Sequence, residues 1–358
     1  MKYVLLNWDK WKAYEKQTEW HELLDLLRND TDFYFTPNLS LNEIQTFILN
    51  HNQENIDIIF PVTGRATNTF LECIQEMTEC LHFINTIKET KLTFYFIPCD
   101  VFYCTSTAKL LELINSSQRD NIKIIYTMLD LDDYTDNVAI KNSNTMSRFE
   151  EIRGKLPQLL SPEKVLFYPH MNYAYELCFI PFNDNPTNKI SLGGHIEGCD
   201  NNEPYYERLL YHNVLKNYPT KYERVIGDRT DRIPSSHNPL KNKFSLSLNK
   251  YLCSIYTGVW GFKKSVVLLK FYEILGSGSL LLVSITQKLI CDKLNLVENK
   301  HYKTINIYDI TEMMTTIDYI LNLNNRTEID QIRKNGQEFC FNHFRADTSY
   351  KVFKTILE

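Results

Sequence analysis

The sequence predicts an α/β protein made of two Rossmann-like, doubly wound domains that face each other across a cleft. Three observations support this fold class. Short apolar runs alternate with amphipathic stretches along most of the chain, which is typical of strands separated by helices. The alternation is interrupted by a polar stretch rich in Pro and Asn, and it then restarts. The length of 358 residues also suits two domains of ~100–200 residues each.

The first half of the chain reads as strands and helices in turn. Because helical stretches of about ten or more residues separate the apolar runs, we expect the strands to be parallel. The expected strands are 3–8, 56–62, 92–99, 122–129 and 164–170, and the expected helices are 19–29, 69–87, 107–116 and 147–160.

The stretch "IPFNDNPTNK", residues 180–189, is the most turn-rich part of the chain. Prolines, asparagines and an Asp between two apolar runs predict an interdomain linker. We therefore place an N-terminal domain at 1–182 and a C-terminal domain at 183–340. A terminal helix at 341–358 is expected to cross back to the N-terminal domain.

The second half repeats the pattern of the first. The expected strands are 190–196, 223–228, 252–258, 279–285 and 302–309, and the expected helices are 204–218, 263–276, 310–322 and 328–357. Open α/β sheets bind ligands outside the carboxyl ends of their strands. The ligand site is therefore expected in the cleft between the two domains.

Composition excludes several classes of function. The net charge is −5, so there is no broad basic surface of the kind that nucleic acid needs. The nine cysteines are scattered without a CxxC pair or a Cys/His cluster, which favours reduced thiols and no metal. The N-terminal apolar run "YVLL" is far shorter than a signal peptide, and no run of ~18 apolar residues is present. We expect a cytoplasmic protein without a transmembrane segment.

The glycine-rich stretch "KFYEILGSGSLLLV", Lys270–Val283, resembles a phosphate loop only in composition. A phosphate loop has the order strand, glycines, helix, because phosphate binds the free amides at a helix N-terminus. Here the helix comes first, so Gly276 and Gly278 predict a helix stop and a tight turn. The phosphate site is expected upstream, where Gly258 leads into the start of the helix at Lys263 and Lys264; the alternative is an ordinary turn with solvated lysines.

Lys270 and Glu273 lie three residues apart on one face of the predicted helix, among apolar neighbours. A Glu in such a position needs a partner or a ligand. It either pairs with Lys270 or binds a ligand.

Four stretches together resemble a known family. "KFYEILGSGSLLLV", "LNKYLCSIYTG", the passage from "FYPHMN" through the linker to "ISLGGHI", and "IRKNGQEFCFNHFRADTSYKVFKTIL" are similar to segments of GT-B glycosyltransferases of the family 4, or "group 1", type. The resemblance covers roughly Val165–Glu358 and is greatest to the branch with spore-maturation-type and large-virus enzymes. A viral protein of this kind would act in the host cytoplasm.

The resemblance implies a glycosyltransferase that moves a sugar from a UDP- or GDP-linked donor to a glycan, a glycoprotein or another hydroxyl acceptor. The donor would bind the C-terminal domain and the acceptor the N-terminal domain. The diphosphate leaving group needs positive charge, which side chains can supply, so neither a metal nor another cofactor is implied.

The family's site residues carry over to numbered positions. Glu273 falls where a Glu binds the nucleotide ribose, and a carboxylate suits two vicinal hydroxyls. Gly193 and Gly194 fall where a glycine lets the backbone approach the sugar diphosphate or the acceptor, and Gly278 and Ser279 take the place of the turn beside the nucleotide. The family's Arg and Lys for the pyrophosphate have no exact match here, and the candidates are Lys263, Lys264, Lys270 and Arg208. One departure concerns Ser265, which stands where the family often has a Glu that contacts the donor sugar.

Two residues are candidate acid/base groups. His170 ends an expected strand and could serve as acid or base or bind phosphate, or it could be a hinge histidine bonded to backbone. Asp100 also ends a strand, where it could activate the acceptor or cap a turn. The acidic cluster at 130–136 lacks the Gly and Glu of a calcium loop and is expected to be a solvated turn.

Two other functions remain open. The chain could be another enzyme of the same architecture, such as an epimerase or a phosphorylase. It could also be a non-catalytic nucleotide-sugar-binding or scaffold protein, which Ser265 in place of the Glu makes conceivable.

Overall fold

A computed structural model describes residues 2–5, 21–35, 46–47, 49–51, 55–62, 82, 92–98, 121–126, 165–167, 176–194, 196, 206–225, 243–257, 259–260, 264–265, 267 and 269–358. These residues form two compact units. The N-terminal unit contains the described residues up to 167 together with 352–358, and the C-terminal unit contains 176–351. Both units are α/β with a parallel sheet, which confirms the predicted fold class of two doubly wound, Rossmann-like domains.

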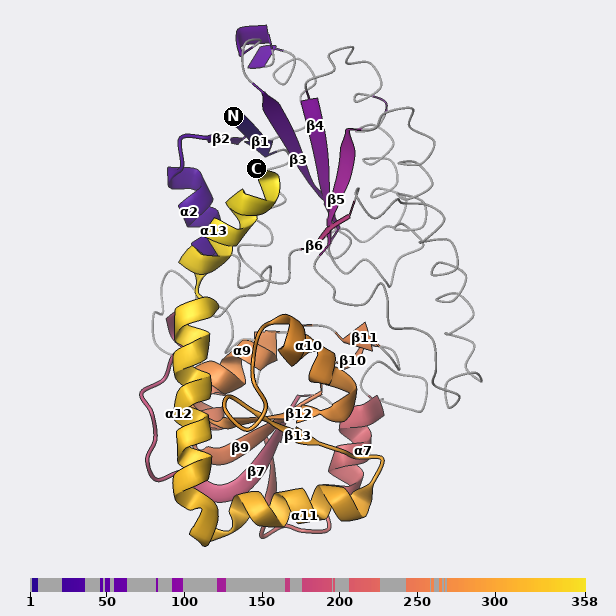
Figure 1. The fold of residues 1–358 in the computed structure, drawn as a ribbon, viewed down its shortest axis with the longest axis vertical. Helices are drawn as coiled ribbons and strands as arrows, with labels where there is room; N and C mark the ends of the chain where they lie inside the picture. Colours follow the sequence, from indigo (N-terminus) through magenta and orange to yellow (C-terminus); the bar gives the residue numbers. More distant parts are fainter. Residues whose placement is uncertain are drawn as a thin grey trace, which may run out of the picture. The chain divides into compact units, whose positions relative to one another are not determined.

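The N-terminal unit is built on a parallel sheet with the strand order β2-β1-β3-β4-β5-β6 (Figure 1). Its strands are β1 (Lys2–Leu5), β2 (Phe33–Phe35), β3 (Ile56–Val62), β4 (Leu92–Pro98), β5 (Ile122–Tyr126) and β6 (Val165–Phe167). Ile58 and Ile59 are neighbours that point to opposite faces, and both are fully buried. Burial on both faces explains why β3 is apolar without interruption from Ile58 to Val62. Helix α2 (His21–Asn29) precedes β2.

The C-terminal unit has a parallel sheet with the order β13-β12-β9-β7-β8. Its strands are β7 (Thr187–Gly193), β8 (Tyr222–Val225), β9 (Tyr251–Tyr256), β12 (Leu280–Ser284) and β13 (Lys303–Ile305). The chain starts in the middle with β7, adds β8 on one side and then builds outwards from β9 on the other. The winding therefore reverses between β7 and β9, which is the topological switch point of the sheet.

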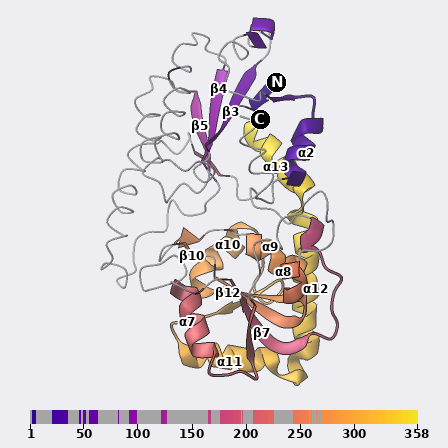
Figure 2. The ribbon, with the colours of Figure 1, turned by 180° about the vertical axis from the view of Figure 1, so that it is seen from behind.

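Helices cover both faces of this sheet (Figures 1 and 2). They are α7 (Tyr206–Leu215), α8 (Lys243–Asn249), α9 (Leu269–Gly276), α10 (Lys288–Lys293), α11 (Ile310–Leu321) and α12 (Arg326–His343). The last helix, α13 (Ala346–Leu357), runs from this unit into the N-terminal unit. Side chains of α7, α11 and α12 form a core with Ile190 and Leu192 of β7. Helices α8 and α9 pack against β9 and β12. All five residues of β12 are buried, as expected of a strand that is covered on both faces.

Gly276 and Gly278 form the helix stop and the turn that the sequence predicts. Helix α9 ends at Gly276, Gly278 has a φ of 72° and β12 begins at Leu280. A Cβ atom on Gly276 would lie 2.7 Å from the carbonyl oxygen of Cys178, so the close approach of that backbone also requires a glycine.

Two predicted helix boundaries are wrong. The helix expected from 263 begins only at Leu269, and Lys264–Ser265 form strand β11, which pairs antiparallel with β10 (Val259–Trp260). The β-branched residues of "SVVLL" favour this extended start, although they continue the apolar pattern of the helix. The single helix expected at 328–357 is two helices, α12 and α13, separated by the buried Phe344 and by Arg345.

The Pro/Asn-rich stretch 180–189 is bonded throughout to the C-terminal unit. Gln337 Nε2 donates to the carbonyl of Ile180 at 2.7 Å, and Asn249 Nδ2 donates to that of Pro181 at 3.1 Å. From Thr187 onwards the stretch is strand β7.

The end of α13 belongs to the N-terminal unit. The Phe353 ring stacks on Phe33 with 6.4 Å between centroids, and Lys354 Nζ lies 2.8 Å from Asp30 Oδ2. No helix in the described ranges is long and apolar enough to cross a membrane.

Candidate functional site

The candidate site lies at the switch point of the C-terminal sheet. Strand β7 ends at Gly193 and is followed by Gly194, and the neighbouring β9 ends at Tyr256 and is followed by Thr257. Leu192 pairs with Ile255 in the register of the two strands. The two carboxyl ends, and the residues that follow them, are therefore adjacent, where open α/β sheets bind ligands.

Two cationic side chains converge on Gly194. A Cβ atom on this residue would lie 2.5 Å from Lys270 Nζ and 2.6 Å from Arg208 Nη1. Lys270 Nζ donates to the carbonyl of Gly193 at 2.5 Å, and Arg208 Nε donates to Thr257 Oγ1 at 3.2 Å. Gly194 has a φ of 109°, so a glycine is needed here for its backbone conformation as well as for the space.

Both cations are deeply buried. Arg208, in the first turn of α7, is 4% exposed, and Lys270, in the first turn of α9, is 7% exposed. Lys270 Nζ also lies 5.7 Å from the centre of the Phe244 ring. Charges at a low-dielectric site interact more strongly than in water. Two such cations beside a glycine can bind a doubly charged anion such as a diphosphate.

Glu273 lies on α9, three residues after Lys270 and so about one turn along the helix. Its side chain is fully buried, as are all residues of α9. The carboxylate therefore belongs to the same helix and the same buried surface as the cation beside Gly194. The ribose role of Glu273 remains a prediction.

Gly278 and Ser279 lie at the opposite end of the strands, the amino end. They precede the amino end of β12, whereas Gly193 ends β7, and the strands are parallel. Ser279 Oγ is hydrogen-bonded to Ser254 Oγ at 2.9 Å, and the carbonyl of Gly278 accepts a hydrogen bond from Arg333 Nε. The structure does not bring these two predicted residues together with the cations.

Several other predicted residues cannot be placed at the site. His170, Asp100, Lys263 and Gly258 lie outside the described residues. Lys264 lies in the strand β11. It is therefore not at the N-terminus of a helix, where the upstream phosphate site was expected.

Two residues of the site were not predicted from the sequence. Thr257, the partner of Arg208, lies at the carboxyl end of the predicted strand 252–258, so its position was a usable signal. The Phe244 ring lies within 2.7 Å of the Cβ position of Gly193. It is part of α8, a short helix that the periodicity did not indicate.

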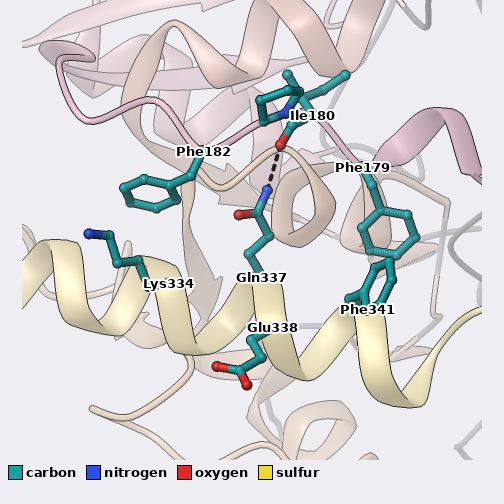
Figure 3. Close-up of a pocket in the computed structure, with 8 residues that line it drawn as sticks. Phe179, Ile180, Phe182, Lys334, Gln337, Glu338 and Phe341 are labelled. Atoms are coloured by element: carbon teal, nitrogen blue, oxygen red, sulfur yellow. Dashed lines mark hydrogen bonds between the residues drawn. The ribbon is translucent and has the colours of Figure 1, made fainter.

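A separate groove of about 480 Å³ lies between residues 179–182 and α12 (Figure 3). It is mostly apolar, and Phe179 packs edge-on against Phe341 with 5.2 Å between ring centroids. Gln337 closes its floor with hydrogen bonds to the carbonyls of Ile180 and Gly276. Gly276 leads into the amino end of β12. The groove therefore lies near the amino ends of the strands, whereas the cationic site lies at their carboxyl ends.

Metal ligands are not grouped in the part of the chain that the structure describes. No set of three or more His, Cys, Asp or Glu side chains there is arranged to hold an ion. The described cysteines Cys178, Cys253, Cys291 and Cys340 are buried, and none of these four is in a disulfide.

The fold is similar to solved structures, although the sequence matches no protein-family model and no curated protein. The N-terminal domain of Candida albicans trehalose-6-phosphate phosphatase is 8% identical, with a TM-score of 0.50 over 99% of this chain and 96% of that chain. A mutant of T4 phage BGT in complex with UDP-glucose is 9% identical, with a TM-score of 0.48 over the whole of both chains. TarM is 11% identical, with a TM-score of 0.46, and this chain spans 57% of its length. At such identities a likeness concerns the fold alone.

Proposed function

We propose that the protein is a glycosyltransferase of GT-B architecture that transfers a sugar from a nucleoside-diphosphate sugar to a hydroxyl acceptor. The observation that carries the proposal is the pair of buried cations, Arg208 and Lys270, that meets Gly194 at the switch point. A sugar nucleotide is bound there by its diphosphate. The solved complex of T4 phage BGT with UDP-glucose is in keeping with this donor class.

The proposed chemistry uses these cations on the leaving group. The acceptor hydroxyl attacks the anomeric carbon, the bond from that carbon to the diphosphate oxygen breaks, and a base takes the hydroxyl proton. Negative charge develops on the diphosphate, where Lys270 and Arg208 stabilise it by fixed hydrogen bonds and charge. The two side chains supply the positive charge, so we propose that the reaction needs no metal.

The remaining roles are proposals from the sequence. Glu273 binds the ribose hydroxyls, His170 or Asp100 takes the proton, and the N-terminal unit binds the acceptor, a glycan or glycoprotein. The donor nucleotide is uridine or guanosine diphosphate.

A thermal-shift screen tests the donor site. UDP-glucose, GDP-mannose and ADP-glucose are each added to the protein, and at roughly a hundred times Kd a ligand stabilises the folded state by about 2.7 kcal/mol. Lys270→Met should abolish the shift, because it removes a cation beside the diphosphate. The matched control is Lys216→Met, at an exposed lysine just after α7, which should leave the shift unchanged. No shift with any of the sugar nucleotides would refute the proposal.

Product analysis separates transfer from its alternatives. With a labelled donor that binds in the screen and a mixture of glycan acceptors, a transferase yields labelled glycan and free nucleoside diphosphate. Interconversion of the donor sugar without an acceptor would indicate an epimerase. Binding without any product would indicate a non-catalytic binding protein.

A further inference from the structure

A second polar cluster lies at the carboxyl end of β12, beside the proposed donor site. Glu207 Oε1 accepts hydrogen bonds from Ser284 Oγ at 2.5 Å and from Thr286 Oγ1 at 3.0 Å. Gln287 Nε2 lies 3.4 Å from the same Thr286 hydroxyl. The carboxyl group of Glu207 thus accepts hydrogen bonds from two hydroxyls. The amide of Gln287 is linked to it through the hydroxyl of Thr286, which bonds both side chains.

Two acceptor atoms of this cluster have no donor. Glu207 Oε2 and Gln287 Oε1 are buried, and neither has a hydrogen-bond partner among the described residues. The two side chains are only 3% and 1% exposed. A buried acceptor without a donor costs about 1–3 kcal/mol, so such atoms commonly mark a place where a ligand or a water donates.

Glu207 is the residue before Arg208, in the first turn of α7. Successive helical residues point about 100° apart, and these two reach neighbouring strands. Arg208 bonds Thr257, just after β9, and Glu207 bonds Ser284, the last residue of β12. Strands β9 and β12 are paired. The cluster of Glu207 and Gln287 and the cationic site therefore lie side by side at the carboxyl ends of neighbouring strands.

The chemistry of the two neighbouring sites differs in a way that matches a sugar nucleotide. The cations suit phosphate oxygens, whereas a carboxylate repels them and accepts from hydroxyls. In a sugar nucleotide the sugar, with its several hydroxyl donors, is joined directly to the diphosphate. We propose that Glu207 and Gln287 accept hydrogen bonds from hydroxyl groups of the transferred sugar; this rests on the proposed donor site. The two residues would then determine which sugar is accepted.

The test compares a nucleotide sugar with its nucleotide. Isothermal titration at about pH 8, where the carboxyl group of Glu207 is ionised because its pKa is about 7, gives Kd of the wild type for UDP-glucose and UDP, and for GDP-mannose and GDP. Glu207→Gln keeps the shape of the side chain and removes its charge. This variant should weaken binding of the sugar nucleotide roughly tenfold, the loss expected for a hydrogen bond to a charged acceptor. The affinity for the free nucleotide should not change. Gln287→Met should give a smaller change in the same direction, and it serves if the Glu207 variant does not fold.

The outcomes are distinct. If the wild type binds none of the four probes, the donor site itself is refuted. If it binds but the variants weaken sugar nucleotide and nucleotide equally, or weaken neither, the sugar subsite is refuted while the donor site stands. Glu298→Gln is the matched control, because Glu298 is a half-buried carboxylate near β13, bonded to Lys288 and Thr304, and its variant should bind all probes like the wild type.

Discussion

A glycine is needed at position 194 both for its backbone conformation and for the space beside it, and the two requirements can be measured separately. Its φ of 109° is unfavourable for other residues, at about 1–3 kcal/mol. Its missing Cβ leaves the space that the ends of Lys270 and Arg208 occupy. Gly194→Ala should therefore lower the free energy of unfolding by about 1–3 kcal/mol and also weaken binding of a sugar nucleotide, because both cations must move. Urea unfolding and titration calorimetry measure the two effects.

Gly278→Ala is the matched control for this variant. Gly278 has a φ of 72°, and the nearest atoms to its Cβ position are those of Phe182 and Gln337. It lies at the amino end of β12, away from the cations. We expect a similar loss of stability with unchanged ligand affinity. Equal loss of affinity in both variants would mean that the effect at Gly194 is unfolding and not displacement of the cations.

The buried carboxyl of Glu207 predicts a pH dependence of stability. Burial raises its pKa from 4.5 to about 7, although hydrogen bonds from Ser284 and Thr286 act in the opposite direction. Between these two values the folded state binds more protons than the unfolded state. Stability contributed by this group is therefore lost as the pH rises, at about 1.4 kcal/mol per pH unit.

Glu207→Gln removes that dependence. The free energy of unfolding of the variant minus that of the wild type should increase from about pH 5 to about pH 7 and then level off. The difference cancels other groups such as Asp57, whose pKa burial raises to about 6. Urea unfolding at several pH values gives this difference, and a difference that does not vary with pH would show that Glu207 is ionised normally.

At the scale of elements, α12 holds the turn and the Pro/Asn-rich stretch through one buried side chain. Arg333, 1% exposed, donates to the carbonyl of Gly278 at 2.9 Å and to that of Asn183 at 2.9 Å, and it pairs with Asp330 at 2.5 Å. Its guanidinium also lies 4.5 Å from the Phe182 ring centre. The planar group makes these contacts in several directions at once, which an ammonium cannot do.

Arg333→Met should lower the free energy of unfolding by at least about 1–3 kcal/mol, because it leaves the carbonyls of Gly278 and Asn183 without this donor. The half-buried Asp330 loses one of its two partners and keeps its pair with Arg326. Arg333→Lys should recover little of the loss. Lys334→Met is the control on the same helix, since Lys334 is exposed and its pair with Asp184 is 3.6 Å long; surface pairs contribute about 0–1 kcal/mol. Urea unfolding compares the three variants, and a loss at Arg333 as small as that at Lys334 would contradict the prediction.

Long apolar runs predicted the central strands, because burial on both faces of a parallel sheet leaves little choice of residue. The strand β3 has the predicted bounds of 56–62. Local patterns failed where tertiary pairing decided the conformation: Lys264–Ser265 join a hairpin with Val259–Trp260, although their neighbours continue a helical pattern. The site shows the same division. Lys270 and Arg208 were named among several cations. Their meeting at Gly194 requires that α7 and α9, which are far apart in the sequence, both bring a side chain to the carboxyl end of β7, and no local pattern indicates this.

At the scale of the whole molecule, each unit has a parallel sheet and buried residues of its own. In the N-terminal unit Ile58, Phe94 and Ile125 are fully buried, and the chain returns to this unit with Phe353, which is 2% exposed. The proposed donor site lies wholly in the C-terminal unit. If the two units unfold separately, a core substitution in the N-terminal unit changes the stability of that unit alone. A ligand bound to the C-terminal unit then stabilises only the C-terminal unit.

Scanning calorimetry can measure this separation with one variant and one ligand. Phe353→Ala removes a buried ring that stacks on Phe33 and should destabilise the N-terminal unit by about 3–5 kcal/mol, lowering one transition. The exposed Thr355 is on the same helix, and Thr355→Ala should leave both transitions in place. A sugar nucleotide that binds in the screen should raise the other transition by mass action. If the variant and the ligand shift one common transition, the two units unfold as a single cooperative structure, and α13, which ends in the N-terminal unit while beginning in the C-terminal one, is the element that couples them.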